Sequence, residues 1–137
     1  MGGQQVKYLL DTHVLVWALD DPDQLPQRCR RLLSEGANLP LGLAAISLWE
    51  IATKSAAGRL VLGRPLADWL SAAVRPPFVS IIPLDERVAV ESSQLPNPFH
   101  KDPADRMIVA TARVHGLTLL TKDQGIRDYA HVKTMWE

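Results

Sequence analysis

Cysteine is almost absent from this chain of 137 residues, in which Cys29 is the only one. A single cysteine excludes an internal disulfide and a metal cluster built on several thiolates. Long apolar runs are missing as well, since no stretch reaches the roughly 18 residues that a membrane-spanning helix needs. The apolar run before Asp11 is too short for a signal peptide. These absences predict a cytoplasmic protein without a membrane anchor.

An excess of one charge is also missing, because 15 Lys and Arg balance 15 Asp and Glu. Net charge therefore gives no argument for a polyanionic partner, and any nucleic-acid binding must come from a local arrangement of charges. Hydrophobic residues make up 47% of the chain and charged residues 22%, which is usual for a globular protein. The length suits one domain over residues 1–137, with enough chain to bury a core.

Apolar runs and helical patterns alternate along the chain. The apolar runs predict strands at residues 6–11, 41–47, 78–83, 117–121 and 132–135. Helices are predicted at residues 25–36, 47–58, 65–74, 85–95 and 103–115, with a short helix in the turn 122–129. Strands that are apolar throughout are typical of a parallel sheet buried on both faces. The pattern therefore predicts an α/β layer fold with a mainly parallel sheet.

Four acids lie at or near strand ends. Asp11 directly follows the first predicted strand, and Asp123 comes two residues after the fourth. Glu50 lies in the first turn of the helix after the second strand, and Asp105 in the first turn of the longest helix. In a parallel sheet, residues that follow strands gather at the carboxyl edge, where ligands bind. We therefore expect these four carboxylates to converge from distant parts of the sequence.

Each acid taken alone also has a purely structural interpretation. Ser47 and Glu50 form a capping-box pattern, in which the serine caps the helix and the glutamate reaches back. Asp102 is placed to cap the longest helix, while Asp105 is favoured there by the helix dipole. The acids after the first and fourth strands can act as a cap and as a turn residue. Separate capping roles would not gather all four at one edge, so the pattern favours a common site.

Carboxylates that converge need a compensating cation or protons. Two unit charges 4 Å apart repel by about 1 kcal/mol in water, and by about 4 kcal/mol at an effective dielectric constant of about 20. The chain offers no cysteine cluster, and its four histidines do not pair at ligand spacing. Hard oxygen ligands then favour Mg²⁺ or Mn²⁺. Such a site indicates phosphoryl or phosphodiester chemistry.

Four segments resemble the PIN-domain ribonucleases, and most of all the VapC-type toxins of prokaryotic toxin–antitoxin pairs. They are LLDTHVLVW at 9–17, SLWEIATK at 47–54, HKDPADRMIVATA at 100–112 and LLTKD at 119–123. Each motif is weak alone, but the four in series are specific and cover nearly the whole chain. The resemblance implies a three-layer α/β/α sandwich with a central, mainly parallel sheet. It also implies hydrolysis of RNA phosphodiester bonds by a water molecule that Mg²⁺ or Mn²⁺ activates.

The resemblance further implies which residues form the site. The acids that would bind the metal and serve catalysis are Asp11, Glu50, Asp105 and Asp123. Thr12, Thr121 and Arg106 match polar positions of the family pattern. The partners implied are an RNA substrate, a cognate antitoxin protein and a second copy of the chain in a homodimer. None of these partners follows from composition or spacing.

Other residues near these segments have two interpretations each. Asp102 is chiefly an N-cap, or else makes an outer-sphere contact with a metal-bound water. The candidate phosphate contacts are the basic residues Lys54, Arg59, Arg106 and Lys122. A metal-activated water needs no histidine, so a base role for His13 or His100 is disfavoured. Trp17, Trp49 and Trp69 are predicted to pack in the core, with a groove for an antitoxin helix as the alternative.

Two other functions stay open from the residues alone. A phosphatase of the haloacid-dehalogenase type would use Asp11 as a covalent nucleophile. Such enzymes usually carry a second acid two residues further on, where this chain has His13. A non-catalytic binding module, with the acids acting as caps, would show neither divalent-metal binding nor nuclease activity.

Overall fold

The computed structural model describes residues 5–137 of the chain. Over these residues, five parallel strands form one sheet in the order β3-β2-β1-β4-β5. The strands are β1 (Tyr8–Leu10), β2 (Leu41–Ala44), β3 (Val79–Ile82), β4 (Thr118–Leu120) and β5 (Thr134–Met135). The predicted parallel sheet is therefore confirmed. Residues 1–4 of the predicted domain lie outside the described residues.

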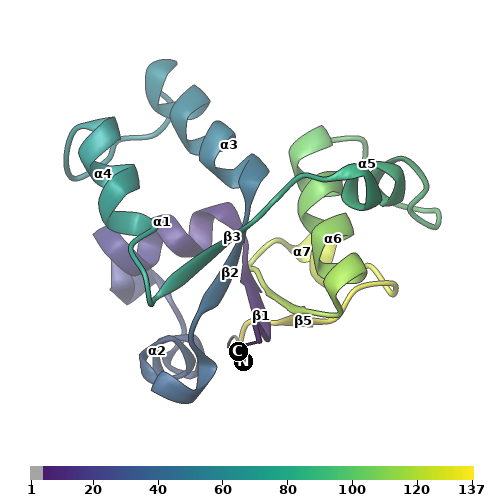
Figure 1. Ribbon diagram of the computed structural model, residues 1–137, viewed down its shortest axis with the longest axis horizontal. Helices are drawn as coiled ribbons and strands as arrows, with labels where there is room; N and C mark the ends of the chain where they lie inside the picture. Colours follow the sequence, from purple (N-terminus) through teal and green to yellow (C-terminus); the bar gives the residue numbers. More distant parts are fainter. Residues whose placement is uncertain (1–4) are drawn as a thin grey trace.

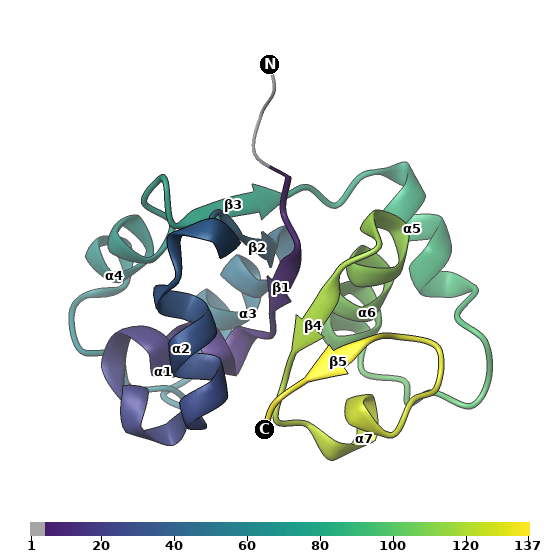
Figure 2. The same ribbon diagram turned by 90° about the horizontal axis from the view of Figure 1, so that it is seen from below.

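Helices cover both faces of this sheet, as Figures 1 and 2 show. One face carries α1 (Thr12–Asp20), α2 (Gln27–Ser34), α3 (Ala45–Ala56) and α4 (Leu66–Ala73). The other face carries α5 (Glu86–Ser93), α6 (Pro103–His115) and α7 (Gln124–Arg127). Two short 3-10 turns, η1 (Pro22–Gln24) and η2 (Gly36–Asn38), flank α2. The predicted three-layer α/β/α arrangement is confirmed.

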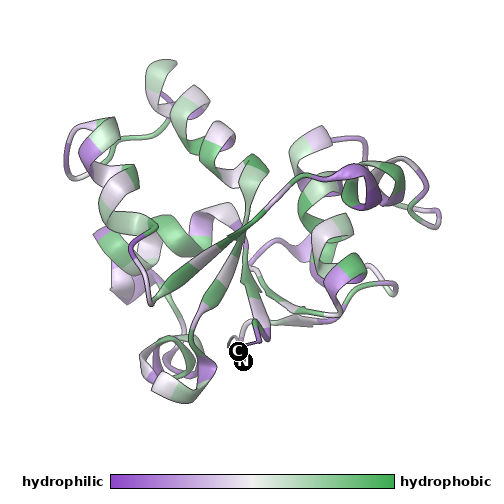
Figure 3. Ribbon diagram, in the orientation of Figure 1, coloured by the Kyte–Doolittle hydropathy of each residue, from purple (hydrophilic) through white to green (hydrophobic). Residues whose placement is uncertain are grey.

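Two apolar cores, one on each side of the sheet, explain why the strands are apolar throughout. Leu10 of β1 packs with α1 and with the fully buried Trp69 of α4. Its neighbour Leu9 points to the opposite face and packs with Ile108 and Val109 of α6. Successive residues of a strand face opposite sides, so both must be apolar when helices cover both faces. Figure 3 shows the apolar residues concentrated in the strands and along the helices that cover them.

The structure corrects the sequence-based boundaries near two site segments. Residues 12–20 were assigned no element but form α1, which follows β1 directly. The predicted strand 41–47 ends at Ala44, and α3 begins at Ala45. The prediction that Ser47 caps this helix was therefore wrong, because Ala44 occupies the N-cap position. Glu50 consequently lies in the second turn of α3 rather than the first.

The carboxyl edge of the sheet carries three aspartate caps. The Asp11 side chain caps α1, Asp102 caps α6 and Asp123 caps α7. The predicted cap at Asp102 is confirmed by a 3.1 Å hydrogen bond from the backbone N–H of Asp105. Among residues 5–137, no helix combines the length and apolarity needed to cross a membrane.

Candidate active site

One cleft of about 260 Å³ gathers all four of the acids that the sequence singled out. It opens at the carboxyl edge of the sheet, next to the ends of β1 and β4, the second turn of α3 and the first turn of α6. The side chains that line it are Asp11, Thr12, His13, Val16, Trp17, Glu50, Lys54, Leu60, Asp102, Asp105 and Asp123. Residues that are up to 112 positions apart in the sequence thus share one surface, as the strand-end argument predicted.

Asp11 is the most buried of these acids, with only 4% of its surface exposed. One carboxylate oxygen accepts a 2.8 Å hydrogen bond from the backbone N–H of Thr12. The other accepts a 2.6 Å hydrogen bond from the hydroxyl of Thr121, at the end of β4. Burial raises the pKa of Asp11, and His13 together with the two hydrogen bonds counteracts part of that rise. The negative charge of Asp11 is therefore only partly compensated by its neighbours in the cleft.

Glu50 connects α3 to the first turn of α1. Its Oε1 accepts a 2.6 Å hydrogen bond from the Thr12 hydroxyl, which also lies 2.8 Å from the hydroxyl of the fully buried Ser47. Its Oε2 lies 2.9 Å from the ammonium group of Lys54, one helical turn further along. The Ser47 contact was missed by the sequence analysis, which treated this residue as a cap. No local pattern signals the contact, because it depends on how α1 and α3 pack.

Asp105 lies in the first turn of α6 and faces the cleft. Its Oδ2 is 2.7 Å from Nε2 of His100, in the loop before the helix. Burial raises the pKa of Asp105 to about 6, and the hydrogen bond with His100 lowers it in part. The negative charges of Asp11 and Asp102 also raise this pKa. An acid with a pKa near 6 carries a proton for part of the time at neutral pH, and a cation can replace that proton.

Asp123 and His13 fix the loop after β4. The backbone N–H of Asp123 donates to the Thr121 hydroxyl at 3.0 Å, and its Oδ1 accepts from Ile126 at 3.1 Å. Nε2 of His13 accepts a 3.0 Å hydrogen bond from the backbone N–H of Lys122. Nδ1 of His13 lies 3.5 Å from Oδ2 of Asp11. Burial lowers the pKa of His13, which suits a neutral ring that accepts through Nε2. The sequence did not predict that His13 connects Asp11 to the loop after β4. The only signal for it is that His13 comes two residues after Asp11 in the chain.

The donor set fits a hard divalent cation, although the carboxylates are not gathered around one point. Over residues 5–137, no three His, Cys, Asp or Glu side chains lie close enough together to hold a metal ion as they stand. Each carboxylate instead bonds to an internal partner, as Lys54 does with Glu50 and His100 with Asp105. The raised pKa values of Asp11 and Asp105 show that the cleft favours added positive charge. Oxygen donors of this kind suit Mg²⁺ or Mn²⁺.

The predicted basic contacts differ in their positions. Lys54 lines the cleft itself, while Arg59 and Lys122 line two hollows that adjoin it. Arg106 does not line the cleft, because its guanidinium donates to the backbone carbonyls of Ser92 and His100. The phosphate contact expected of Arg106 stays a prediction. In the structure its side chain holds the loop that carries His100.

The tryptophans also differ from one another. Trp69 is fully buried, which confirms its predicted place in the core. Trp17 is half-buried against the same core and also lines the cleft. Trp49 is 59% exposed, so its predicted core position was wrong. The reason is that α3 packs through Ile51, on a different side of the helix from Trp49.

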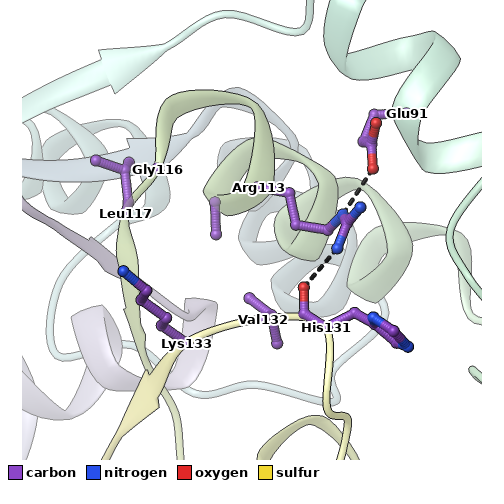
Figure 4. Close-up of a pocket in the computed structure, with 8 residues that line it drawn as sticks. Glu91, Arg113, Gly116, Leu117, His131, Val132 and Lys133 are labelled. Atoms are coloured by element: carbon purple, nitrogen blue, oxygen red, sulfur yellow. Dashed lines mark hydrogen bonds and ion pairs between the residues drawn. The ribbon is translucent and has the colours of Figure 1, made fainter.

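A separate hollow of about 310 Å³ lies between α6, the start of β4 and the loop before β5 (Figure 4). Arg113 dominates it and donates 2.6 Å hydrogen bonds to Glu91 of α5 and to the backbone carbonyl of His131. These bonds join α5, α6 and the loop before β5. The guanidinium therefore has a structural role here, and His131 and His115 are exposed.

The parallel sheet between two helical layers and the acidic cleft at its carboxyl edge are the features expected of a PIN-like domain. The chain belongs to the PIN-domain family, whose pattern matches residues 8–132. It is similar to "Ribonuclease VapC22" of Mycobacterium tuberculosis, with 35% identity over 130 residues that cover 93% of this chain and 97% of the relative. Family and relative together place the chain among the VapC-type PIN ribonucleases, the toxins of type II toxin–antitoxin pairs.

Solved structures agree on the fold. VapBC2 from Rickettsia felis, bound to a DNA fragment from its promoter, matches with a TM-score of 0.71 and 15% identity, over 96% of this chain and 100% of that one. DNA-bound VapBC from Salmonella typhimurium matches with a TM-score of 0.68 and 20% identity, over 96% and 98% of the two chains. At these identities the likeness shows the fold alone. It confirms the predicted PIN-like architecture.

Proposed function

We propose that this VapC-type ribonuclease is metal-dependent and that Asp11, Glu50, Asp105 and Asp123 hold Mg²⁺ or Mn²⁺ during RNA hydrolysis. The observation that carries the proposal is the meeting of these four carboxylates in one cleft. Capping alone does not account for it, because Glu50 caps no helix and Asp105 is itself bonded by the cap Asp102.

The internal bonds suggest how the cleft changes when a cation enters. Asp11 is held by two short hydrogen bonds and keeps its position. Glu50 and Asp105 would hold the cation in place of their contacts with Lys54 and His100, whose side chains are both more than a third exposed. The ammonium group of Lys54, which lines the cleft, would then be available to a substrate phosphate. When bound, the metal lowers the pKa of a coordinated water and so supplies the nucleophile.

The two rival functions fit the geometry less well. A covalent phosphatase of the haloacid-dehalogenase type would use Asp11 as its nucleophile. The position where such enzymes usually carry a second acid is occupied by His13, which bonds to the backbone of Lys122. A module without catalysis does not explain why burial leaves Asp105 with a pKa of about 6 at an open cleft.

Cleavage of a defined RNA in Mn²⁺, with and without EDTA, tests the proposal. The wild type should cut only with the metal, and Asp11→Asn should fold but not cut. Asp23→Asn is the matched control, because Asp23 is an exposed acid far from the cleft, with 92% of its side chain exposed. Cleavage that persists in EDTA, or in the Asp11 variant, would contradict the metal site.

We also propose that the chain pairs with a cognate antitoxin and forms a homodimer. An apolar hollow of about 390 Å³ between α1, α2 and α4 supports the first part, with Leu15, Leu19 and Leu33 in its lining. Its size and lining suit the apolar face of a helix from the antitoxin. Co-purification with the product of the neighbouring gene, lost in Leu19→Glu, tests this pairing. Sedimentation tests the dimer, and a monomer at tens of micromolar would overturn it.

A further inference from the structure

The acidic cleft continues into a hollow on either side. One hollow, of about 390 Å³, shares His13, Trp17 and Asp123 with the cleft and adds Lys122. The other, of about 210 Å³, shares Glu50, Lys54 and Asp102 with the cleft and adds Trp49 and Arg59. The three hollows therefore adjoin one another, and together we call them the edge groove. Each end of the edge groove holds one tryptophan and at least one basic side chain.

Trp17 is held in place at one end of the edge groove. Its ring meets His13 edge to face, with centroids 4.9 Å apart, and tilts against Trp136 at 6.1 Å. The ammonium group of the exposed Lys122 lies 5.4 Å from the Trp17 ring centroid. A flexible lysine can leave this position for a nearby phosphate and uncover the ring. The Trp17 indole is thus held by two aromatic neighbours, and an exposed lysine lies over its ring.

Trp49 stands at the other end of the edge groove and is largely open to solvent. It is 59% exposed, directly before Glu50 in α3, and Arg59 lines the same hollow. Burying the flat surface of this ring against a ligand would be favourable. A phosphorylated ligand matches the adjacent positive charge.

We propose that Trp17 and Trp49 stack unpaired bases of the RNA on either side of the phosphate that lies at the acids. The inference rests on the proposed ribonuclease function and adds two side chains that would bind the unpaired bases next to the cleaved bond. The edge groove offers only a few basic side chains for the phosphates, namely Lys54, Arg59 and Lys122, so uncharged contacts must add to the affinity for RNA. Stacking on aromatic rings provides such contacts with any base, and bases in a duplex are already stacked on their neighbours.

Substitutions that separate stacking from packing test this inference. Trp17→Leu and Trp49→Leu keep an apolar side chain but lose the aromatic face, whereas the Phe variants keep one. Each Leu variant should raise KM for a single-stranded RNA about tenfold, or about 1.4 kcal/mol, with kcat nearly unchanged, and Phe should restore most of the loss. Phe78→Leu is the matched control, because Phe78 is 56% exposed at the opposite edge of the sheet. The same strand in a duplex should be cut poorly.

A binding measurement distinguishes failure of this inference from failure of the ribonuclease proposal. Single-stranded RNA should quench tryptophan fluorescence of Asp11→Asn, and the quenching should fall when Trp17→Leu or Trp49→Leu is added. If the wild type cuts RNA but the Leu variants keep the wild-type KM, or if duplex is cut equally well, stacking is overturned. If Trp49→Leu alters sedimentation but not KM, Trp49 belongs to a protein interface and its stacking role is overturned. If the wild type cuts nothing in Mn²⁺ or Mg²⁺, the ribonuclease proposal fails, and the quenching alone decides whether the edge groove binds RNA.

Discussion

The hydroxyl of Thr121 donates a 2.6 Å hydrogen bond to Oδ2 of Asp11, across 110 positions of sequence. The same hydroxyl accepts a 3.0 Å hydrogen bond from the backbone N–H of Asp123. One fully buried side chain therefore fixes the acid after β1 relative to the acid after β4. Because the hydroxyl uses its single proton for Asp11, the carboxylate is held in one orientation before any cation binds.

Replacing this hydroxyl should weaken both the fold and the site. Thr121→Val keeps the shape but leaves the Asp11 oxygen and the Asp123 N–H without their partner. A buried polar group left unpaired costs about 1–3 kcal/mol, so the free energy of unfolding should fall by that amount. Thr121→Ser, which keeps the hydroxyl, should lose less. Urea unfolding measures the stability, and calorimetry with Mn²⁺ should show weaker binding in the Val variant. Equal stability of Thr121→Val and the wild type would contradict this account.

The pH dependence of stability should show the raised pKa of Asp105. This carboxyl has a pKa of about 6 in the folded chain and an ordinary value of 3.8. At a pH between these two pKa values, Asp105 holds a proton in the folded state that it has released in the unfolded state. The free energy of unfolding therefore contains a term that falls as pH rises from about 4 to about 6 and then levels off. Asp105→Asn lacks this term, so its stability relative to the wild type should increase over the same interval.

Thermal melts in EDTA from pH 4 to 8 measure this difference. Mn²⁺ should reverse the trend in the wild type, because the cation binds the deprotonated acid and stabilises the fold increasingly above pH 6. Asp23→Asn is again the control and should follow the wild type at every pH. A stability difference between Asp105→Asn and the wild type that does not change with pH would show that the pKa of Asp105 is not raised.

Strand ends were predictable from the sequence, and the partners of the acids were not. Asp11 and Asp123 follow apolar runs, and Pro103 and Gly116 mark the limits of α6 in the sequence and in the structure, where Gly116 has φ 66°. These signals act over a few residues. The bonds from Thr121 to Asp11 and from Lys122 to His13 span 110 and 109 positions and exist only once the strands are paired.

The errors have the same physical origin. α1 was missed because its apolar residues follow β1 without a break other than the cap Asp11. The polar pattern from Ser47 to Glu50 looks like a helix start, but Ser47 is buried against Thr12 within a helix that has already begun. Trp49 has the composition of a core residue, and its exposure depends on which side of α3 faces the sheet. The local sequence pattern predicts the helices and strands, while the packing of these elements decides which side chains stay exposed to solvent.

Added Mn²⁺ should stabilise the wild type by mass action. At a concentration about 100 times the dissociation constant, the gain is about 2.7 kcal/mol. A differential scanning measurement with millimolar Mn²⁺ should therefore show a higher Tm, which EDTA reverses. Glu50→Gln should reduce the shift, because the amide is a neutral and weaker donor. An unchanged Tm, together with no heat of binding in calorimetry, would count against a metal in this cleft.

The sharpest test compares Asp11→Asn, Asp105→Asn and the double variant. Asn caps a helix about as well as Asp, so Asp11→Asn can keep the hydrogen bond from Thr12 that starts α1. Burial raises the pKa of Asp11, which means that the fold disfavours its charge. Removing this charge should leave the fold intact or more stable. If the acids served only as caps, RNA cleavage would also be unchanged.

A shared metal site predicts a different result for cleavage. Substituting a residue that only supports a metal ligand typically lowers metal affinity or activity by about 10–100-fold. Losing a carboxylate that binds the metal directly should therefore lower the rate of cleavage by at least about 100-fold. Because both substitutions dismantle one site, the double variant should be little worse than either single variant. Rates of cleavage of one RNA in Mn²⁺, with circular dichroism and a melt for each variant, give the comparison. Losses that simply multiply would mean that Asp11 and Asp105 act independently, and a folded Asp11→Asn with near wild-type cleavage would remove Asp11 from the site.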